Sequence, residues 1–437
     1  MTKNYFWYRI LFIFLVLLFR MSLDKFYIEY QPMLEIKWKF LYNLRSDFEL
    51  FLSYLFLLII SYTIPIYTNK PSKFILFILF LFSYISASSY IIFNNQIDFT
   101  PFVFLSLFFF IISLLLRIDT STNTSIILKK TLIRKKYIIL GIILIILLLT
   151  IIQIKAFGFS LNPPNLLNVY EVREAYKNSM GRFSGYATTW TANVFAVFLF
   201  AYGVINKKII FITIAFILDI YIYSITGMKS TLFSLAFVTL TLVGYKLLKE
   251  YISIFFIGFF LFANSVILLF LQYDIVKTIG ILFTRRLFMV TAQIFFFFTD
   301  YVKTHSYDYF AQNLPFSLFM TSHYEKKIPY LIGNEYYGIP ELAANSNIFG
   351  DFYFNLGAFG LFILLLLFYI ILKFIDNIAL GKNNYIIFSL FIMPSFAMTN
   401  SAFFTSLLTH GFLIAIFVLY FYKDKEYKLY TLSNKDK

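Results

Sequence analysis

Residues 137–154 read YIILGIILIILLLTIIQI, a stretch of 18 residues without a charged side chain. An α-helix rises about 1.5 Å per residue, so a helix of this length spans about 27 Å, close to the thickness of the hydrocarbon core of a bilayer. Comparable stretches recur along the chain, which is 60% hydrophobic and 14% charged. A soluble domain has about 25% charged residues. The sequence therefore predicts an all-α, polytopic integral membrane protein.

The apolar windows predict about twelve transmembrane helices in a single transmembrane domain, residues 1–437. They are expected at about Tyr5–Ser22, Glu49–Tyr67, Phe74–Phe93, Phe99–Leu116, Tyr137–Ile154, Ala187–Ile205, Ile209–Thr226, Thr231–Leu248, Ile252–Leu271, Ile348–Leu372, Tyr385–Thr399 and Phe403–Tyr422. Because twelve is an even number, both termini are expected on the same side of the membrane.

Basic residues indicate which side is cytoplasmic. The segment Arg117–Lys136 contains six basic residues and one acidic residue, and alternate threading puts it on the same face as both termini. Cytoplasmic loops carry the excess of lysine and arginine. Both termini are therefore predicted to be cytoplasmic, including a tail at residues 423–437.

The same threading leaves two long polar segments on the outer face, residues 155–186 and 272–347, with a shorter one at 24–47. Long loops over a rigid scaffold commonly carry function. Within 272–347, the apolar stretch Leu287–Thr299 is about 13 residues long. This length favours a re-entrant or interfacial helix over a full crossing.

The first outer segment combines basic, acidic and aromatic residues. Arg173 and Arg182 could hold phosphate oxygens in two-point geometry, and Tyr176 could stack against a sugar ring. The alternative is a solvated loop in which the arginines pair with Glu171 and Glu174.

Three further basic residues are placed near the outer edge of the membrane. Adjacent Arg285 and Arg286 are costly to desolvate without an anionic partner, which could be a phospholipid headgroup or a lipid-linked diphosphate. Lys229 follows a tight turn, where it could extend to the interface as a lipid-facing lysine does or contact an anion inside a cavity.

Candidates for a general base are few. His305 and His323 carry imidazoles that can accept a proton near neutral pH, although a lone histidine in a loop is more often merely exposed. Asp351 begins a polar stripe at the start of a predicted helix, where small and polar residues could equally serve helix packing. Asp219 falls midway along another predicted helix and is expected to face the bundle interior.

The composition excludes several other classes of site. The chain has no cysteine and three histidines, so no metal site and no cofactor are predicted. Its formal charge of +15 is scattered between apolar stretches rather than gathered on a polar domain, so no nucleic-acid partner is expected.

Taken in order, these features resemble the oligosaccharide repeat-unit polymerases, the Wzy-type O-antigen polymerases of bacteria. The resemblance covers most of the chain as an architecture. Its most recognisable segments are Arg173–Trp190, Gly227–Ser230, Arg285–Arg286 and Asn345–Gly360.

The resemblance implies a membrane glycosyltransferase of GT-C-like architecture in the bacterial inner membrane. Its substrates would be oligosaccharides linked to undecaprenyl diphosphate, joined on the periplasmic face, with membrane lipid and a separate chain-length regulator as further partners. The residues implied in binding diphosphate or glycan are Arg173, Arg182, Lys229, Arg285, Arg286 and Tyr176, and those implied as catalytic base are Glu171, His305 or Asp351.

Two other functions fit the same pattern. An O-antigen ligase uses the same donor but transfers the glycan to the lipid A core. A flippase for lipid-linked oligosaccharides would move its substrate without chemical change, and it would line a central cavity with its basic residues.

Overall fold

The computed structural model describes residues 3–118, 135–165, 169–313 and 316–422. These residues form helices and contain no β-strand, only an isolated bridge between Asn43 and Asn94. Within the described residues, ten helical stretches are long and apolar enough to cross a membrane. The predicted tail at 423–437, and most of the basic segment 117–136, lie outside the described residues. The all-α, multi-pass membrane character predicted from composition is confirmed.

The elements follow one another along the chain, and the longest connection between the described helices, residues 302–327, contains only the short stretch η6. The α-helices are α1 (Lys3–Trp38), α2 (Asp47–Thr63), α3 (Pro71–Leu79), α4 (Ile85–Tyr90), α5 (Thr100–Ile118), α6 (Lys135–Phe157), α7 (Val169–Ser179), α8 (Arg182–Trp190), α9 (Val197–Ile205), α10 (Ile209–Thr226), α11 (Lys229–Leu248), α12 (Ile252–Leu269), α13 (Asp274–Gly280), α14 (Val290–Tyr301), α15 (Ile328–Tyr337), α16 (Ile348–Ala379), α17 (Asn384–Met398), α18 (Phe403–Leu408) and α19 (Phe412–Phe421). Short π-helical stretches are η1 (Phe80–Tyr84), η3 (Thr191–Ala196) and η5 (Ile281–Met289), and 3₁₀ stretches are η2 (Ile91–Phe93), η4 (Lys249–Tyr251) and η6 (Phe316–Leu318).

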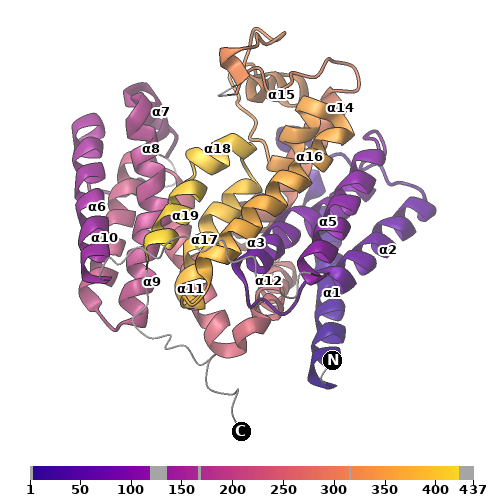
Figure 1. The fold of residues 1–437 in the computed structure, drawn as a ribbon. Helices are drawn as coiled ribbons and strands as arrows, with labels where there is room; N and C mark the ends of the chain where they lie inside the picture. Colours follow the sequence, from indigo (N-terminus) through magenta and orange to yellow (C-terminus); the bar gives the residue numbers. More distant parts are fainter. Residues whose placement is uncertain (1–2, 119–134, 166–168, 314–315, 423–437) are drawn as a thin grey trace.

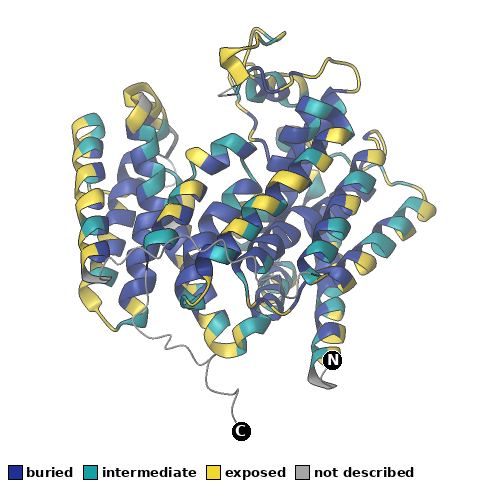
Figure 2. Ribbon diagram, viewed as in Figure 1, coloured by how far each residue is buried: buried dark blue, intermediate teal, exposed yellow. Residues whose placement is uncertain are grey.

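The helices form a bundle in which α6, α7, α8 and α10 lie at one side and α1, α2 and α5 at the other (Figure 1). The stretch from α3 to η2 is wholly buried at the centre, whereas the outward faces of the peripheral helices are exposed (Figure 2). Many of these exposed side chains are large and apolar, such as Leu144 and Leu148 on α6. They are suited to contact lipid, which serves as the solvent of this surface.

Two arginines bind the backbone at the C-terminal end of α2. Arg9 Nη1 donates to the carbonyl oxygens of Ser61 and Ile64, at 3.0 and 2.6 Å, and Arg117 donates to that of Tyr62. The last carbonyl groups of a helix have no partner within the helix. Two side chains from α1 and α5 therefore satisfy groups that would otherwise be unpaired.

Helix α1 is longer than predicted, because it continues past Ser22 to Trp38 without a break. Arg20 forms an ion pair with Asp24, one turn later, and its Nε donates to Ser88 Oγ at 3.0 Å. Tyr54 donates to the same carboxylate at 2.7 Å. The pairing places charged residues inside a helix that the apolar window ended too early, so the predicted outer segment 24–47 begins as helix.

Ring contacts show that α1 and the α3–α4 stretch run side by side in the same direction. Phe12 lies 6.3 Å from Phe80, and Tyr27 lies 5.8 Å from Tyr90, measured between ring centroids. Residue numbers therefore increase together along the two helices, so the two helices are parallel.

The helix predicted at Leu287–Thr299 is 28 residues long in the structure and runs from Asp274 through η5 to Tyr301. Its first part packs along α1 in the opposite direction. Tyr30 Oη donates to the Val276 carbonyl oxygen at 3.4 Å, and the Phe288 ring lies 5.1 Å from that of Phe19, three helical turns further down α1.

The second part of this helix packs along α4 in the same direction as α4. Phe288 stacks on Phe82 at 5.2 Å, and Phe296 stacks on Tyr90 at 5.7 Å. The first part of the helix therefore packs along α1 and its second part along α4. Its length and composition would allow it to cross a membrane, and the re-entrant arrangement stays a prediction.

Helix α16 is broken at Gly357, whose φ of 63° and ψ of −153° are not helical. A Cβ atom on Gly360 would lie 2.1 Å from the carbonyl oxygen of Phe352, so the two halves of α16 are in close backbone contact at the break. The first half runs from the N-cap Asn347 to the break at Gly357. The Asn347 side chain donates to the Thr291 carbonyl oxygen at 3.0 Å. The polar turn before α16 is thus buried inside the bundle.

Candidate functional site

Helix α7 lies across the end of the bundle and covers the turn between α10 and α11. Arg173 Nε donates to the Gly227 carbonyl oxygen at 3.1 Å. Gly227 ends α10 with a φ of 61°, and a Cβ atom there would lie 3.0 Å from the Val169 carbonyl oxygen. Lys229 is half-buried and begins α11 directly after this turn. The structure therefore brings two predicted anion-binding residues, Arg173 and Lys229, to one place.

Tyr176 anchors α7 instead of presenting its ring to solvent. Its side chain is buried, its hydroxyl forms a 2.8 Å hydrogen bond with the hydroxyl of Thr188, and its ring lies 4.7 Å from that of Phe157. Burial raises the pKa of Tyr176, and the hydrogen bond to Thr188 acts in the opposite direction. A ring held in this way is not available to stack against a sugar.

The two other predicted residues of this region lie at helix starts. Glu171 is exposed in the first turn of α7, where its charge interacts favourably with the helix dipole. Arg182 is the first residue of α8, after a cap in which Gly181 N–H donates to Ser184 Oγ at 2.9 Å. Both belong to the same end of the bundle as Arg173.

Arg285 and Arg286 lie in η5, within the 274–301 helix. Arg285 is 7% exposed and its guanidinium stacks over the Trp38 ring at 4.1 Å, whereas Arg286 is exposed. Burial raises the pKa of Tyr337 to about 12, while the positive charges of both arginines act to lower it. Arg285 therefore joins α1 to η5, and Arg286 is the member of the pair that faces outward.

His305 is exposed in the loop after α14. Its ring stacks on Tyr301 at a centroid distance of 3.9 Å, and its Nδ1 lies 3.0 Å from the Tyr301 carbonyl oxygen. Thr304 Oγ1 also lies 2.9 Å from this Nδ1. Nδ1 donates to the Tyr301 carbonyl oxygen in the tautomer that leaves the lone pair on Nε2, and it accepts from the Thr304 hydroxyl in the other tautomer. The first tautomer is the one that a general base acting through Nε2 requires.

Asp351 occupies a different environment from the other two predicted bases. Its carboxylate is 4% exposed and accepts from the Phe403 backbone N–H at 2.9 Å and from Asn355 Nδ2 at 3.4 Å. It therefore holds the first turn of α18 against α16. Glu171 and His305 are exposed, and Asp351 is not.

Several contacts of polar groups were not predicted from the sequence. Arg20 and Asp24 are four residues apart, which is a recognisable spacing for an ion pair on one helix face. The partners of Asp308 and Asn355 could not be recognised in this way, because Ser322 and Phe310 are distant from them in the sequence. The predicted interior position of Asp219 is confirmed, since it is buried and accepts from Ser234 Oγ at 3.1 Å.

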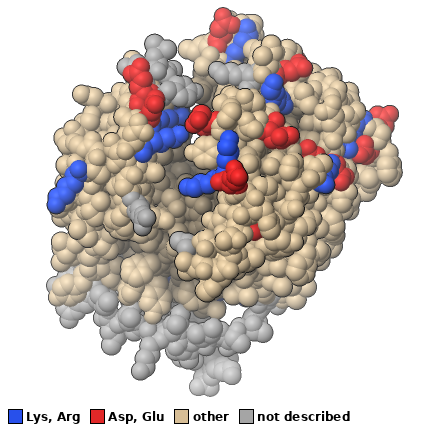
Figure 3. Space-filling model, turned by 90° about the horizontal axis from the view of Figure 1, so that it is seen from above, with Lys and Arg blue, Asp and Glu red and all other residues tan. Residues whose placement is uncertain are grey.

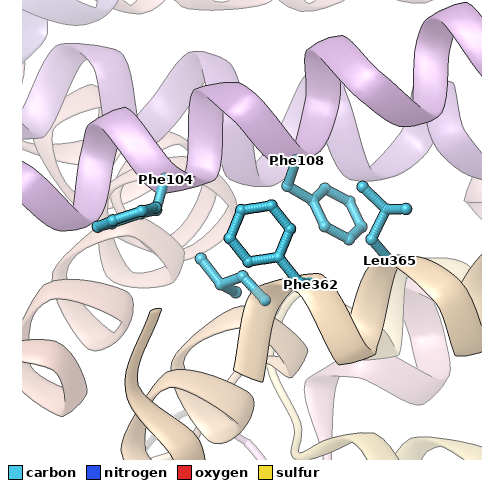
Figure 4. Close-up of a pocket in the computed structure, with 5 residues that line it drawn as sticks. Phe104, Phe108, Phe362 and Leu365 are labelled. Atoms are coloured by element: carbon cyan, nitrogen blue, oxygen red, sulfur yellow. The ribbon is translucent and has the colours of Figure 1, made fainter. Parts of the chain in front are cut away.

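The face seen from above is hollowed, and lysine, arginine, aspartate and glutamate side chains gather at the edges of the hollow (Figure 3). A separate crevice between α5 and α16 is lined only by apolar side chains (Figure 4); these are Phe104, Phe108, Leu361, Phe362 and Leu365. Charged side chains that could contact a polar substrate therefore surround the hollow, whereas the crevice offers only apolar side chains.

Over the described ranges, no group of three or more histidine, aspartate or glutamate side chains is placed to hold a metal ion. Comparisons with protein-family models, curated proteins and solved structures find no match to this chain. Its chemistry must therefore be inferred from its own residues.

Proposed function

We propose that this protein is a membrane glycosyltransferase that polymerises oligosaccharide units linked to undecaprenyl diphosphate on the periplasmic face of the bacterial inner membrane. The observation that carries the proposal is the division of the outer basic residues into two groups. Arg173 and Lys229 form one group at α7. Arg285 and Arg286 form the other in the 274–301 helix, which the proposed topology treats as re-entrant.

Polymerisation needs two lipid-linked substrates, and each of them carries a diphosphate. One is the donor, which bears the growing glycan, and the other is the acceptor, which bears a single repeat unit. Two separate cationic groups match this requirement, with one group for each diphosphate. The donor's diphosphate gains charge as it leaves, so cations fixed beside it stabilise the transition state.

The proposed reaction uses the exposed imidazole of His305. A hydroxyl oxygen of the acceptor bonds to the anomeric carbon of the donor, while the bond from that carbon to the diphosphate oxygen breaks. The electron pair leaves with undecaprenyl diphosphate, and the hydroxyl proton passes to His305 Nε2. The 3.0 Å contact of Nδ1 with the Tyr301 carbonyl supports this choice, because the tautomer that donates to this carbonyl leaves Nε2 without a proton. Glu171 is the alternative base.

The proposal includes a topology of twelve crossings. These are α1, α2, the α3–α4 stretch, α5, α6, the α8–α9 stretch, α10, α11, α12, the second half of α16, α17 and the α18–α19 stretch. The 41-residue stretch from Lys229 to Leu269 counts as two crossings, because η4 joins α11 to α12 within it. The 274–301 helix counts as none. Both termini are then cytoplasmic.

The test is a deletion strain complemented with variants. Deletion should leave lipopolysaccharide capped with a single repeat unit. Arg173→Ala and Arg286→Ala should each lower long-chain polymer about ten- to a hundredfold, because a hydrogen bond to a charged group contributes about 1.5–3 kcal/mol. Lysine at either position should restore part of the polymer. Lys326→Ala, which changes an exposed lysine on the same side, is the matched control.

Two outcomes would replace the proposal. A bare lipid A core in the deletion strain would identify a ligase, and unpolymerised repeat units on the cytoplasmic side would identify a flippase. Normal polymer in both arginine variants, at normal protein level, would remove the two basic groups from the reaction.

A further inference from the structure

The loop that follows α14 alternates between exposed and buried side chains. Tyr307 is 36% exposed and Tyr309 is 46% exposed, whereas Asp308 and Phe310 are buried. The centroids of the two tyrosine rings lie 6.2 Å apart and the rings are at 78° to each other, so the two partly exposed rings are nearly perpendicular. This loop lies on the same side of the membrane domain as α15, opposite the first residues of α1 (Figure 1).

The backbone of this loop is in a conformation that side chains disfavour. Tyr309 has a φ of 52° and Phe310 a φ of 63°, two consecutive residues in the left-handed region. Such a conformation costs free energy for residues other than glycine, and it persists only when the surrounding structure enforces it. Strain of this kind occurs most often at functional sites.

Two buried residues enforce the conformation. The Asp308 carboxylate accepts from Ser322 Oγ at 2.5 Å and from the Gln312 N–H at 3.1 Å. Phe310 N–H donates to Asn355 Oδ1 at 2.6 Å. The Phe310 ring packs among other aromatic rings, 4.9 Å from that of Phe352 and 5.6 Å from that of Phe404. The loop is therefore fixed to α16 and α18.

Packing explains the side chain of Phe310 but not that of Tyr309. Glycine adopts a φ of 52° without strain, so it is the least costly residue at position 309. The chain instead has a large aromatic residue there, with almost half of its surface exposed. A strained position that presents a ring to the outside is best explained by a ligand that binds the ring.

We infer that Tyr307 and Tyr309 form a binding platform for a carbohydrate. The face of a sugar ring is apolar and its edge carries hydroxyl groups. A tyrosine matches this pattern with an apolar ring and a polar tip, and it has little side-chain freedom to lose on binding. The two rings at 78° contact a sugar from two directions, and the fixed loop lowers the entropic cost of binding.

The platform also lies next to a proposed catalytic group. His305 is two residues before Tyr307 in the same loop, and the Tyr307 hydroxyl lies over Gly357, where α16 is broken. A repeat unit held on the two tyrosines would bring its hydroxyl groups near the exposed imidazole. The claim that the platform binds the acceptor glycan rests on the proposed function. The claim that it binds a carbohydrate does not depend on that function.

The decisive variant is Tyr309→Gly, because it separates strain from binding. Glycine removes the ring and relieves the strain, so the full-length protein in nanodiscs should unfold at the same or a higher temperature. The probe is the repeat-unit oligosaccharide released from the host's own lipopolysaccharide, with binding measured by titration calorimetry. Affinity should fall at least tenfold in Tyr309→Gly and in Tyr307→Ala, and Tyr309→Phe should keep most of it. Tyr273→Ala, at an exposed tyrosine after α12, is the control.

Wild-type affinity in Tyr309→Gly, or an equal loss in Tyr273→Ala, would overturn the platform. Absence of binding to the wild-type protein would do the same. The polymer phenotype separates this failure from failure of the proposed function. If deletion of the gene leaves polymerisation intact but the protein binds the glycan through Tyr309, the platform stands and the polymerase assignment fails. If deletion abolishes polymer but Tyr309→Gly supports normal binding and chain length, only the platform fails.

Discussion

Gly357 is the residue at which α16 reverses, and its replacement by alanine tests the broken helix directly. Its φ of 63° and ψ of −153° fall in a region that only glycine occupies readily. Holding an alanine there costs about 1–3 kcal/mol. The new Cβ atom would also lie 2.7 Å from the Tyr307 hydroxyl, which must move. Because that hydroxyl is the end of a flexible side chain, its displacement adds less, and we expect Gly357→Ala to destabilise the protein by about 3 kcal/mol.

The matched control is Gly381→Ala, in the turn between α16 and α17. Gly381 also has a positive φ, 72°, but no atom lies within 4 Å of the position that a Cβ atom would occupy. Only the backbone cost applies there, about 1–2 kcal/mol. Unfolding by sodium dodecyl sulfate in mixed micelles, with the full-length chain, gives both free energies. Equal stability of the two variants would refute the reasoning, because the break would then tolerate a side chain.

Two more predictions concern buried contacts. Arg20→Met should destabilise the protein by about 3–5 kcal/mol in the same unfolding assay, because it leaves the Asp24 carboxylate without its ion pair; the added change Asp24→Leu should recover most of this loss, and no recovery would show that the pair is not the cause. Tyr176→Phe should cost about 1 kcal/mol, the value of the hydrogen bond to Thr188, and leave polymer length unchanged. Shorter polymer from a Tyr176→Phe protein of normal stability would show that this hydroxyl binds substrate.

Long apolar stretches made most of the fold predictable. The helix at 137–154 in the sequence is contained in α6, and its flanking charges mark its ends. The same reasoning ended α1 too early, since Asp24 and Lys25 interrupt the apolar window. The helix continues because Arg20 neutralises Asp24 on the same face. A window that averages hydropathy has no means of recognising a charge that is paired inside the bundle.

Helix α7 shows a different limit. Its sequence is polar, so no apolar window identified it, yet Val169, Val172 and Tyr176 recur at helical spacing. These side chains face the bundle, whereas Glu171, Glu174 and Lys177 are exposed. The 274–301 helix was recognised over only half of its length, because Asp274, Lys277 and the two arginines fall in its first half.

The candidate site was predictable in composition but not in arrangement. Arginine, lysine and histidine in the outer segments could be named from charge placement alone. The contact of Arg173 with the Gly227 turn joins residues 54 positions apart, and no local pattern encodes such a contact. Burial of Tyr176 and Asp351 likewise depends on packing between distant helices, so the sequence could not separate them from the exposed candidates.

The arginines at the end of α2 have a consequence for how the chain acquires its orientation. In the proposed topology, Arg9 and Arg117 are among the positive charges that would retain a segment on the cytoplasmic side during insertion. In the folded protein the same guanidinium groups bind the carbonyl oxygens of Ser61, Ile64 and Tyr62. In that topology the charges that orient α1, α2 and α5 also make the contacts that join them, so a wrongly inserted α2 would lack both its anchor and its neighbours.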